Sequence, residues 1–185
     1  MKKIVLTFGL ISGAIASAMM ALNIAFQDQI GFDRGEIIGY TSMVVAFLLI
    51  YFGVRSYRDN VAGGSVTFGR AFKVGALIAV VASVCYVGTW QVIYFGFKTD
   101  FMEKYQAHLI EQARAGGETE AELEKRRADM DRFAKLYRNP VINAGVTLLE
   151  PLPVALVITL VTAGVLSRQK RSDSAAMNAG ARVMT

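Results

Sequence analysis

The sequence has one cysteine and one histidine in 185 residues. A lone cysteine excludes an intramolecular disulfide, and a single cysteine with a single histidine excludes the Cys/His clusters that bind zinc. We therefore predict no metal site. We expect Cys85 to be a small packing residue and His108 to be a surface residue, with a pH-sensing role for His108 as the alternative.

Motifs for nucleotide binding and catalysis are also missing. The sequence contains no P-loop, no dinucleotide-binding fingerprint and no nucleophile–base pair. We therefore predict no cofactor, no catalytic residues and no enzyme activity. The net charge of +5 does not indicate a nucleic-acid partner, because the excess of Lys and Arg lies beside apolar segments and no DNA- or RNA-binding signature is present.

Charge is almost absent from four long stretches. They run 23, 18, 24 and 26 residues without Lys, Arg or Asp and hold one carboxylate, Glu150; they are Ile4–Phe26, Ile37–Val54, Val74–Phe97 and Val141–Leu166. A helix of about 20 apolar residues crosses a hydrocarbon layer of about 30 Å. The sequence therefore predicts an all-α polytopic membrane protein with four transmembrane helices at about 4–26, 37–54, 74–97 and 141–166.

The N-terminus shares features with a cleavable signal peptide. Lys2 and Lys3 precede the first apolar stretch, and Ala16-Ser17-Ala18 has small residues at the spacing of a cleavage site. The apolar stretch continues to Phe26, beyond the roughly 7–15 residues of a signal h-region. We therefore expect a retained helix, with cleavage as the alternative.

The distribution of Lys and Arg predicts the orientation. Segment 55–73 and the tail after residue 166 each have four basic residues and one acidic residue. Segment 27–36 has one basic and three acidic residues, and segment 98–140 has nine of each. With Lys2 and Lys3 at the N-terminus, a strict count gives ten basic residues on each side, a tie. Short, almost purely basic flanks carry more weight than a long loop. We therefore predict that both termini are cytoplasmic and that segment 98–140 is extracytoplasmic.

Segment 98–140 has helical patterns of its own. Phe101, Tyr105 and Leu109 recur every fourth residue, Gly116-Gly117 interrupts the pattern, and Thr119 followed by Glu122 forms a capping box. A second apolar stripe follows at Leu123, Met130, Phe133 and Tyr137. We predict a helical hairpin between the third and fourth spans, with a continuation of the third span as the alternative. Its alternating charges indicate a solvated face, or alternatively a partner surface.

Glu150 is the feature of the spans that most suggests a function. A carboxyl at membrane depth costs about 2.5–3.5 kcal/mol and usually faces protein or water. Pro151 and Pro153 each remove a backbone donor, so the fourth helix should kink or break there. Three roles stay open: a hydrogen-bonded structural group, a proton or ligand site, and a catalytic acid. The candidate intramembrane polar site comprises Glu150 and three side chains of the third span, Gln91, Tyr94 and Tyr86.

Segment 55–73 is the candidate for contact with lipid phosphate. Its basic side chains lie at headgroup height beside flexible glycines, and they are Arg55, Arg58, Arg70 and Lys73. Interfacial anchoring is the expected role, and specific binding of an anionic ligand is the alternative.

Small residues predict where the spans pack against one another. In the first span they recur every fourth residue at Gly9, Gly13, Ser17 and Ala21; the third has Gly75, Ala79 and Ser83, and the fourth has Ala155, Thr159 and Ala163. Such stripes allow close approach of helix backbones in lipid. The pattern does not assign which stripe contacts which.

At several of these positions the chain resembles the bacterial membrane-protein family known as domain of unknown function 4199. The resemblance covers roughly residues 3–168 and rests on Gly35-Glu36-Ile37-Ile38-Gly39-Tyr40 with Met43, Tyr57-Arg58-Asp59, Gly63-Gly64 with Phe68-Gly69, Asp100-Phe101, Lys104-Tyr105, His108, Asn139-Pro140 and Glu150-Pro151-Leu152-Pro153-Val154. It implies four spans with a retained first helix in a bacterial cytoplasmic membrane. It implies no activity, because the family has none assigned.

The sequence thus predicts a four-span membrane domain at 1–168 that includes the outside hairpin at 98–140, and a disordered cytoplasmic tail at 169–185. The expected function is non-catalytic binding of a membrane partner: a lipid, especially an anionic one, another membrane protein or a second copy of the chain. The alternatives are a proton- or ion-coupled carrier that uses Glu150, and an enzyme acting on a lipid-linked substrate.

Overall fold

The computed structural model describes residues 1–97 and 100–183, and it describes side chains as far as Ser167. All regular structure in these residues is helical: α1 (Lys2–Ala25), α2 (Gln27–Ile30), α3 (Phe32–Asn60), α4 (Phe68–Gln91), the π-helical turn η1 (Val92–Gly96), α5 (Phe101–Ala115), α6 (Glu120–Tyr137), α7 (Pro140–Leu149) and α8 (Pro151–Val183). The all-α prediction is confirmed.

Four helical segments are long and apolar enough to cross a membrane: Lys2–Ala25, Phe32–Asn60, Phe68–Gly96 and Pro140–Ser167. They coincide with the four predicted spans, but the second and third helices begin earlier than predicted, and the second also ends later. The predicted limits, 37–54 and 74–97, mark where charge stops. A helix continues into water through charged residues, so an apolar run gives the part in contact with lipid rather than the helix ends.

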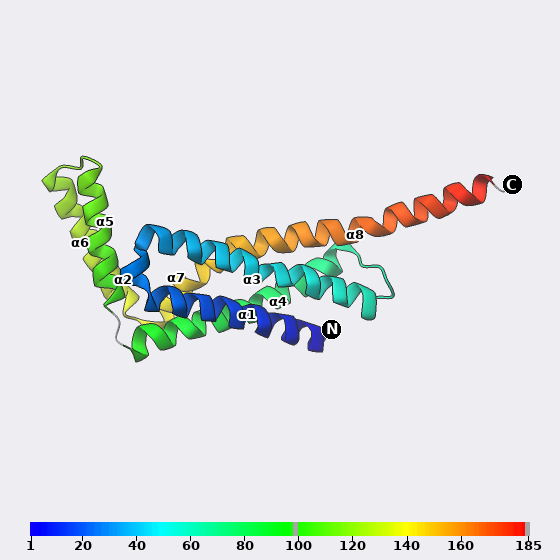
Figure 1. The fold of residues 1–185 in the computed structure, drawn as a ribbon, viewed down its shortest axis with the longest axis horizontal. Coiled ribbons are helices and arrows are strands. Elements are labelled where there is room, and N and C mark those ends of the chain that lie inside the picture. The colour runs from blue at the N-terminus through cyan, green and yellow to red at the C-terminus, as the bar shows by residue number, and fades with distance from the viewer. Residues whose placement is uncertain (98–99, 184–185) are drawn as a thin grey trace.

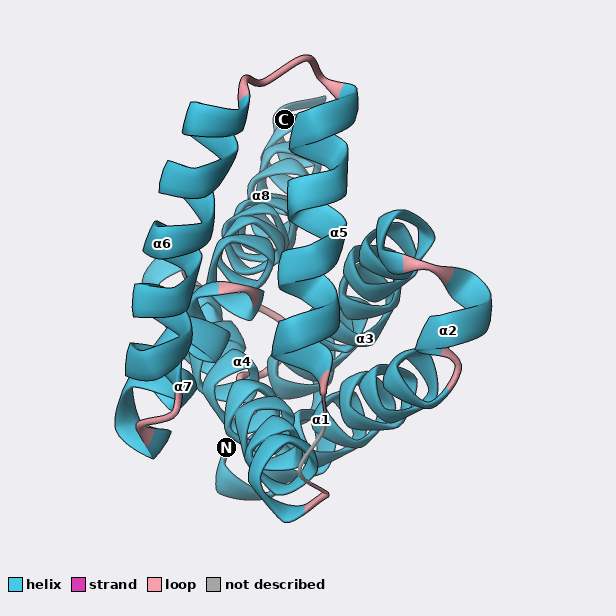
Figure 2. Ribbon diagram, turned by 90° about the vertical axis from the view of Figure 1, so that its left-hand side faces the viewer, coloured by secondary structure: helices cyan, strands magenta, loops and turns pink. Residues whose placement is uncertain are grey.

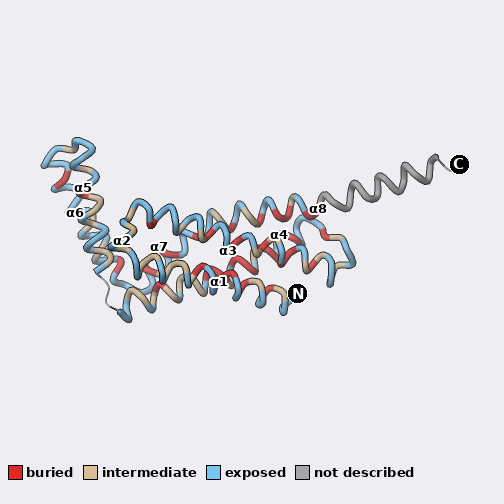
Figure 3. Tube along the Cα trace, in the orientation of Figure 1, coloured by how far each residue is buried: buried red, intermediate tan, exposed pale blue. Residues whose placement is uncertain are grey.

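The apolar surface of these helices faces outward. Only 22% to 39% of the residues in their most apolar stretches are buried inside the protein. Large side chains such as Leu6, Val45, Val84 and Val157 remain exposed on the outside, and buried residues gather where the helices face one another (Figure 3). A soluble protein rarely exposes so much contiguous apolar surface. The arrangement therefore fits a multi-pass membrane protein.

The two ends of the bundle differ. Figure 1 shows the N-terminus and the loop between α3 and α4 at one end, and α2, α5 and α6 at the other. At this second end α5 and α6 lie side by side in front of the bundle (Figure 2). Segments far apart in the sequence, α2 and α5, therefore meet at the same end.

Small residues allow the bundle helices to pack closely. A Cβ atom added to Gly13 would lie 2.6 Å from the Cβ of Cys85 on α4, and one added to Gly9 would lie 2.7 Å from the Cβ of Val81. A Cβ added to Gly75 of α4 would lie 2.9 Å from Thr159 on α8. The predicted stripes are thus contacts within the bundle: α1 packs on α4, and α4 packs on α8.

The fourth span is broken as predicted. Helix α7 ends at Leu149, α8 begins at Pro151, and Glu150 is the residue between them. Pro151 has no N–H for the carbonyl of Thr147, and the N–H of Glu150 donates to this carbonyl instead, at 3.4 Å. Proline chemistry therefore places Glu150 at a junction between two helices.

The predicted helices of segment 98–140 are also confirmed. The turn between α5 and α6 contains Gly117 with φ of 89°, and the Thr119–Glu122 capping box begins α6. The backbone N–H and the hydroxyl of Thr119 both donate to the Glu122 carboxylate and lower its pKa, because they stabilise its charged form. Arg126 pairs with Glu118 across the turn.

Helix α8 extends to Val183, through most of the segment predicted as a disordered tail (169–185). The side chains of that segment and residues 184–185 lie outside the described part of the structure, so its disorder stays a prediction.

Candidate functional site

A cavity of about 470 Å³ lies at the α5–α6 end of the bundle. Its walls come from the C-terminal part of α1, the start of α2, the first half of α3, the end of α4, the inner face of α5, and parts of α6 and α7. The volume falls within the range of about 300–1,000 Å³ that is typical of small-molecule sites. No pair of adjacent helices builds it, so the packing of the whole bundle sets its shape.

Helix α5 covers the cavity because it is held to the start of α3. The Phe32 ring lies 5.7 Å from the ring of Phe101 and stacks on His108 at 5.1 Å. Polar contacts add to this: Nε2 of His108 lies 3.1 Å from Oδ1 of Asp33, and Nε2 of Gln112 donates to the same oxygen at 2.8 Å. The predicted apolar stripe of α5 faces the bundle, where Phe101, Tyr105 and Leu109 line the cavity.

A second polar clamp joins α5 to α2. The Lys104 ammonium donates to Asp28 at 2.8 Å and lies 3.4 Å from Asp100. The hydrogen bond to Asp28 raises the pKa of Lys104. His108, which we expected to be a free surface residue, therefore belongs to a set of contacts that fixes α5 over the cavity.

Glu150 lines the deep side of the cavity next to Tyr86. The Tyr86 hydroxyl donates to Oε2 of Glu150 at 2.8 Å. Both side chains line the cavity. The structure thus brings together two of the four residues of the predicted polar site.

The other two, Gln91 and Tyr94, do not contact Glu150. Nε2 of Gln91 donates to Oδ1 of Asn143 at 2.8 Å, and the ring of Tyr94 packs edge-on against Tyr137 at 5.3 Å. Asn143 is fully buried. Gln91, the last residue of α4, therefore connects this helix to α7, and Tyr94 of η1 packs on α6.

A buried hydrogen-bonded chain supports this side of the cavity. Nε1 of Trp90 donates to the Tyr137 hydroxyl at 2.8 Å, and this hydroxyl lies 3.2 Å from Oγ1 of Thr147. Burial raises the pKa of the Tyr137 phenol. Trp90, Tyr137 and Thr147 all line the cavity, so its wall is held by side chains with fixed partners.

The sequence prediction missed the polar side chains that α1, α2 and α3 contribute. Asn23, Gln27, Asp33 and Glu36 all line the cavity. Nδ2 of Asn23 donates to the Gly35 carbonyl at 2.6 Å, while Oδ1 of Asn23 and Nε2 of Gln27 are buried without a partner among the described residues. The sequence signal that could have indicated this part of the cavity was Asn23, a polar residue near the end of the first apolar stretch.

The carboxylates of the cavity affect the pKa of Tyr105 on the covering helix α5. Burial raises the pKa of the Tyr105 phenol, and the nearby charges of Glu36 and Glu150 raise it further, because negative charge disfavours a phenolate. A cavity with aromatic walls and carboxylates suits a ligand that has an apolar body and a hydrogen-bond donor or positive charge. In the part of the chain that the structure describes, no group of three or more His, Cys, Asp or Glu side chains gathers at one point.

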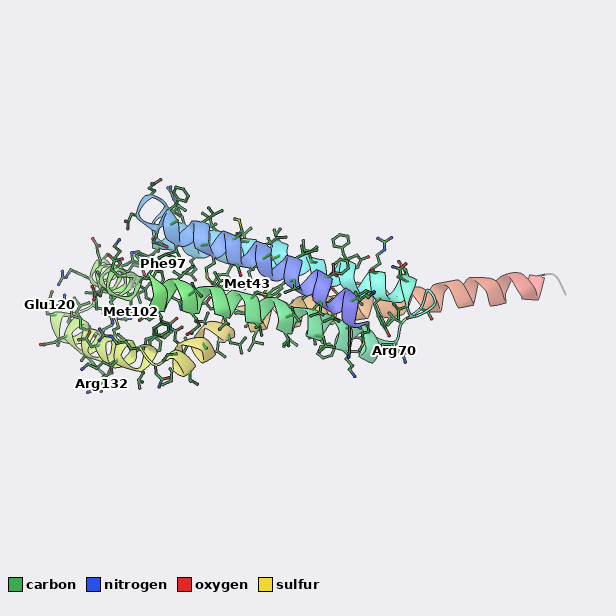
Figure 4. All side chains as sticks on the ribbon, turned by 90° about the horizontal axis from the view of Figure 1, so that it is seen from below. Met43, Arg70, Phe97, Met102, Glu120 and Arg132 are labelled. Atoms are coloured by element: carbon green, nitrogen blue, oxygen red, sulfur yellow. The ribbon has the colours of Figure 1, made fainter. Side chains whose placement is uncertain are left out.

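The four predicted phosphate-contacting residues lie at the opposite end of the bundle, on α3 and α4. Arg58 donates to Asp59 at 2.7 Å, and Arg55 lies 3.7 Å from the same carboxylate. Arg70 and Lys73 are exposed and form no ion pair with the described carboxylates. Figure 4 shows Arg70 at the opposite end of the helix bundle from Glu120 and Arg132.

The comparisons with known proteins identify the family. A search of curated proteins and a search of solved structures both found no match. A family model described as a protein of unknown function, DUF4199, matches residues 7–168. This range contains every residue of the cavity and most of the chain. The chain therefore belongs to the DUF4199 family.

Proposed function

We propose that this protein is a non-catalytic binding protein of a bacterial cytoplasmic membrane, and that its ligand is an amphipathic membrane component held in the cavity beneath α5. The observation that carries the proposal is the cavity itself, which has aromatic walls and the hydrogen-bonded Tyr86–Glu150 pair on its deep side. Partially buried polar groups that face a cavity are a feature of binding sites.

The proposed orientation has both termini in the cytoplasm and the α5–α6 pair outside. Its support is the basic end of the bundle, where the N-terminus and the loop between α3 and α4 lie together (Figure 1). Basic residues favour the cytoplasmic side. In this orientation the cavity lies near the outer membrane surface, where an amphipathic molecule has access from the bilayer.

Filling the cavity provides the test. Gly39 lines it, and a Cβ atom added there would have only Nδ2 of Asn23 within 4 Å, at 3.7 Å. We expect Gly39→Leu to place its side chain in the cavity and to displace the ligand without strain. Native mass spectrometry of protein released from membranes should show a bound small molecule on the wild type and loss of most of it from Gly39→Leu.

Gly88→Leu is the matched control. Gly88 is an exposed helical residue of α4, outside the cavity, and an added Cβ would meet nothing within 4 Å. This variant should keep the bound molecule. Equal occupancy in wild type, Gly39→Leu and Gly88→Leu, or a wild type without any bound molecule, would contradict the proposal.

We further propose that Arg70 and Lys73 contact anionic lipid at the cytoplasmic surface, together with Arg55 and Arg58. Each basic side chain near an anionic membrane contributes about 1 kcal/mol. Phosphatidylglycerol should therefore raise the melting temperature of the wild type in nanodiscs, and the rise should shrink in Arg70→Gln/Lys73→Gln. The matched pair Lys125→Gln/Lys135→Gln, exposed on α6, should keep the full rise, and a loss in both pairs would disprove a specific role.

The second candidate function is an ion-coupled carrier. It is favoured by the break between α7 and α8, because interrupted helices at membrane depth provide ion sites in carriers. Four spans in one chain leave little room for a pathway, so this function would require a second copy or another membrane protein.

A further inference from the structure

We propose that the cavity selects an amphipathic cation: a molecule with an ammonium or other positively charged group attached to an apolar body. This inference rests on the proposed binding function and specifies its ligand class. Three properties of the cavity carry it, namely its charge, its aromatic walls and an unsatisfied hydrogen-bond acceptor.

The charged side chains that line the cavity are almost all acidic. They are Asp33, Glu36 and Glu150, with His108 as the one basic residue, and neither Lys nor Arg occurs in the lining. The nearest lysine in sequence, Lys104, lies outside the lining and is paired with Asp28 and Asp100.

Two of the three carboxylates are available to a ligand. Asp33 accepts from Gln112 and contacts His108, so its charge serves to hold α5. No ion pair with Glu36 or Glu150 occurs among the described residues, and Tyr86 is the neutral hydrogen-bond donor to Glu150. Carboxylates without a cationic partner, at the edge of a low-dielectric medium, favour a positively charged guest over a neutral or anionic one.

The walls between these carboxylates are aromatic. Phe32, Tyr40, Tyr86, Trp90, Phe101 and Tyr105 all line the cavity. The rings of Trp90 and Phe101 lie 5.2 Å apart, those of Phe101 and Phe32 5.7 Å, and those of Phe32 and Tyr105 5.6 Å, so these four rings form a continuous surface. Ring faces attract ammonium groups, most strongly where water is excluded.

An unsatisfied acceptor points to the same ligand. Oδ1 of Asn23 and Nε2 of Gln27 are buried without a partner among the described residues, and both residues belong to the cavity lining. A buried acceptor that has lost water costs about 1–3 kcal/mol unless a donor reaches it. An N–H or a hydroxyl on the cationic end of a ligand would satisfy it.

The rest of the lining suits an apolar body. Met20 and Ile24 of α1, Met43 of α3 and Met102 of α5 contribute flexible apolar surface, and Figure 4 labels Met43 on the bundle and Met102 on the covering helix. Methionine adapts to ligands of different shape. The expected ligand therefore combines a positive group near Glu36 and Glu150 with an apolar part against these methionines.

The test uses probes of one shape and different charge. The full chain in phosphatidylcholine nanodiscs is titrated with tetraphenylphosphonium, tetraphenylborate and uncharged triphenylphosphine oxide. Trp90 is the only tryptophan of the protein and lines the cavity, so its fluorescence reports occupancy directly. Nanodiscs that carry Gly39→Leu protein correct for partition of each probe into lipid.

We expect saturable quenching by tetraphenylphosphonium and none by tetraphenylborate. Glu36→Gln and Glu150→Gln should each weaken binding of the cation about tenfold, the loss of one charge–charge attraction of about 1.4 kcal/mol. Glutamine at position 150 still accepts from Tyr86, and Glu36 forms no hydrogen bond in the described structure, so both variants should fold. Glu103→Gln, an equal charge change on α5 outside the lining, should bind as the wild type does.

The outcomes separate the two proposals. Equal binding of all three probes, lost in Gly39→Leu, would overturn the selection of cations and leave the binding function in place. Tighter binding of tetraphenylborate would overturn it as well. No saturable response to any probe, together with no bound molecule in native mass spectrometry, would overturn the binding function itself.

Discussion

Gly13→Leu is expected to destabilise the protein by about 1–3 kcal/mol or more, the cost typical of overpacking a well-packed core. An added Cβ at this position would lie 2.6 Å from the Cβ of Cys85 and 3.2 Å from the Cα of Ala82. The second of these atoms is backbone and has no rotamer that relieves the clash. Helix α1 would have to move away from α4, and the wall of the cavity would move with it. Thermal unfolding in mild detergent, followed by light scattering, measures the loss.

The control for this prediction is again Gly88→Leu, a glycine-to-leucine change in α4 that meets nothing within 4 Å. It removes the flexibility of glycine from a helix, so its melting temperature should equal or slightly exceed that of the wild type. If Gly13→Leu melts together with wild type and Gly88→Leu, the assigned packing of α1 on α4 is wrong.

The same contact shows what the sequence can and cannot predict. The spacing of Gly9 and Gly13 marks one face of a helix, because the helical period is a local property. The partner of that face is set by how several helices fit together, and the sequence offered two further stripes of small residues. The structure resolves the choice: Gly13 meets Cys85, and Gly75 meets Thr159.

Local chemistry was predictable in other places too. The capping box at Thr119 and the break at Pro151 depend on residues within one turn of the chain, and both were confirmed. The ends of α3 and α4 were not predicted correctly, since hydropathy reports the lipid boundary and these helices continue past it.

The candidate site was predictable only in part. Glu150 was identified because a carboxyl in an apolar stretch is costly, and Tyr86 because it lies on the neighbouring span. Glu36 and Asn23 were not included in the predicted polar site, because they lie at the connection between the first and second spans. Nothing in the sequence near them indicates that α5 folds over them. A site built from seven helices depends on the rotation of each helix about its axis, which tertiary packing determines.

Substitutions at Glu150 separate a binding site from a transport site, and each has a distinct expected result. Glu150→Leu removes the acceptor of the Tyr86 hydroxyl, and an unsatisfied donor costs about 1–3 kcal/mol; the melting temperature should fall. Glu150→Gln keeps an acceptor at the same place, so its melting temperature should match the wild type. Tyr86→Phe removes the donor and should restore stability to Glu150→Leu, because the apolar pair then needs no hydrogen bond.

Proton flux in liposomes decides between the two functions. If the protein is a binding protein with Glu150 as a ligand contact, wild type and Glu150→Gln should show no more proton flux than empty liposomes, with or without a cationic amphiphile. Only the wild type should bind the cation tightly. A carrier predicts cation-driven proton movement in the wild type and its loss in Glu150→Gln at unchanged stability. Because the Tyr86–Glu150 pair lies at the junction of α7 and α8, a carrier would use that junction to move, whereas a binding protein keeps it fixed. Flux that depends on Glu150 would therefore replace the binding function with the carrier.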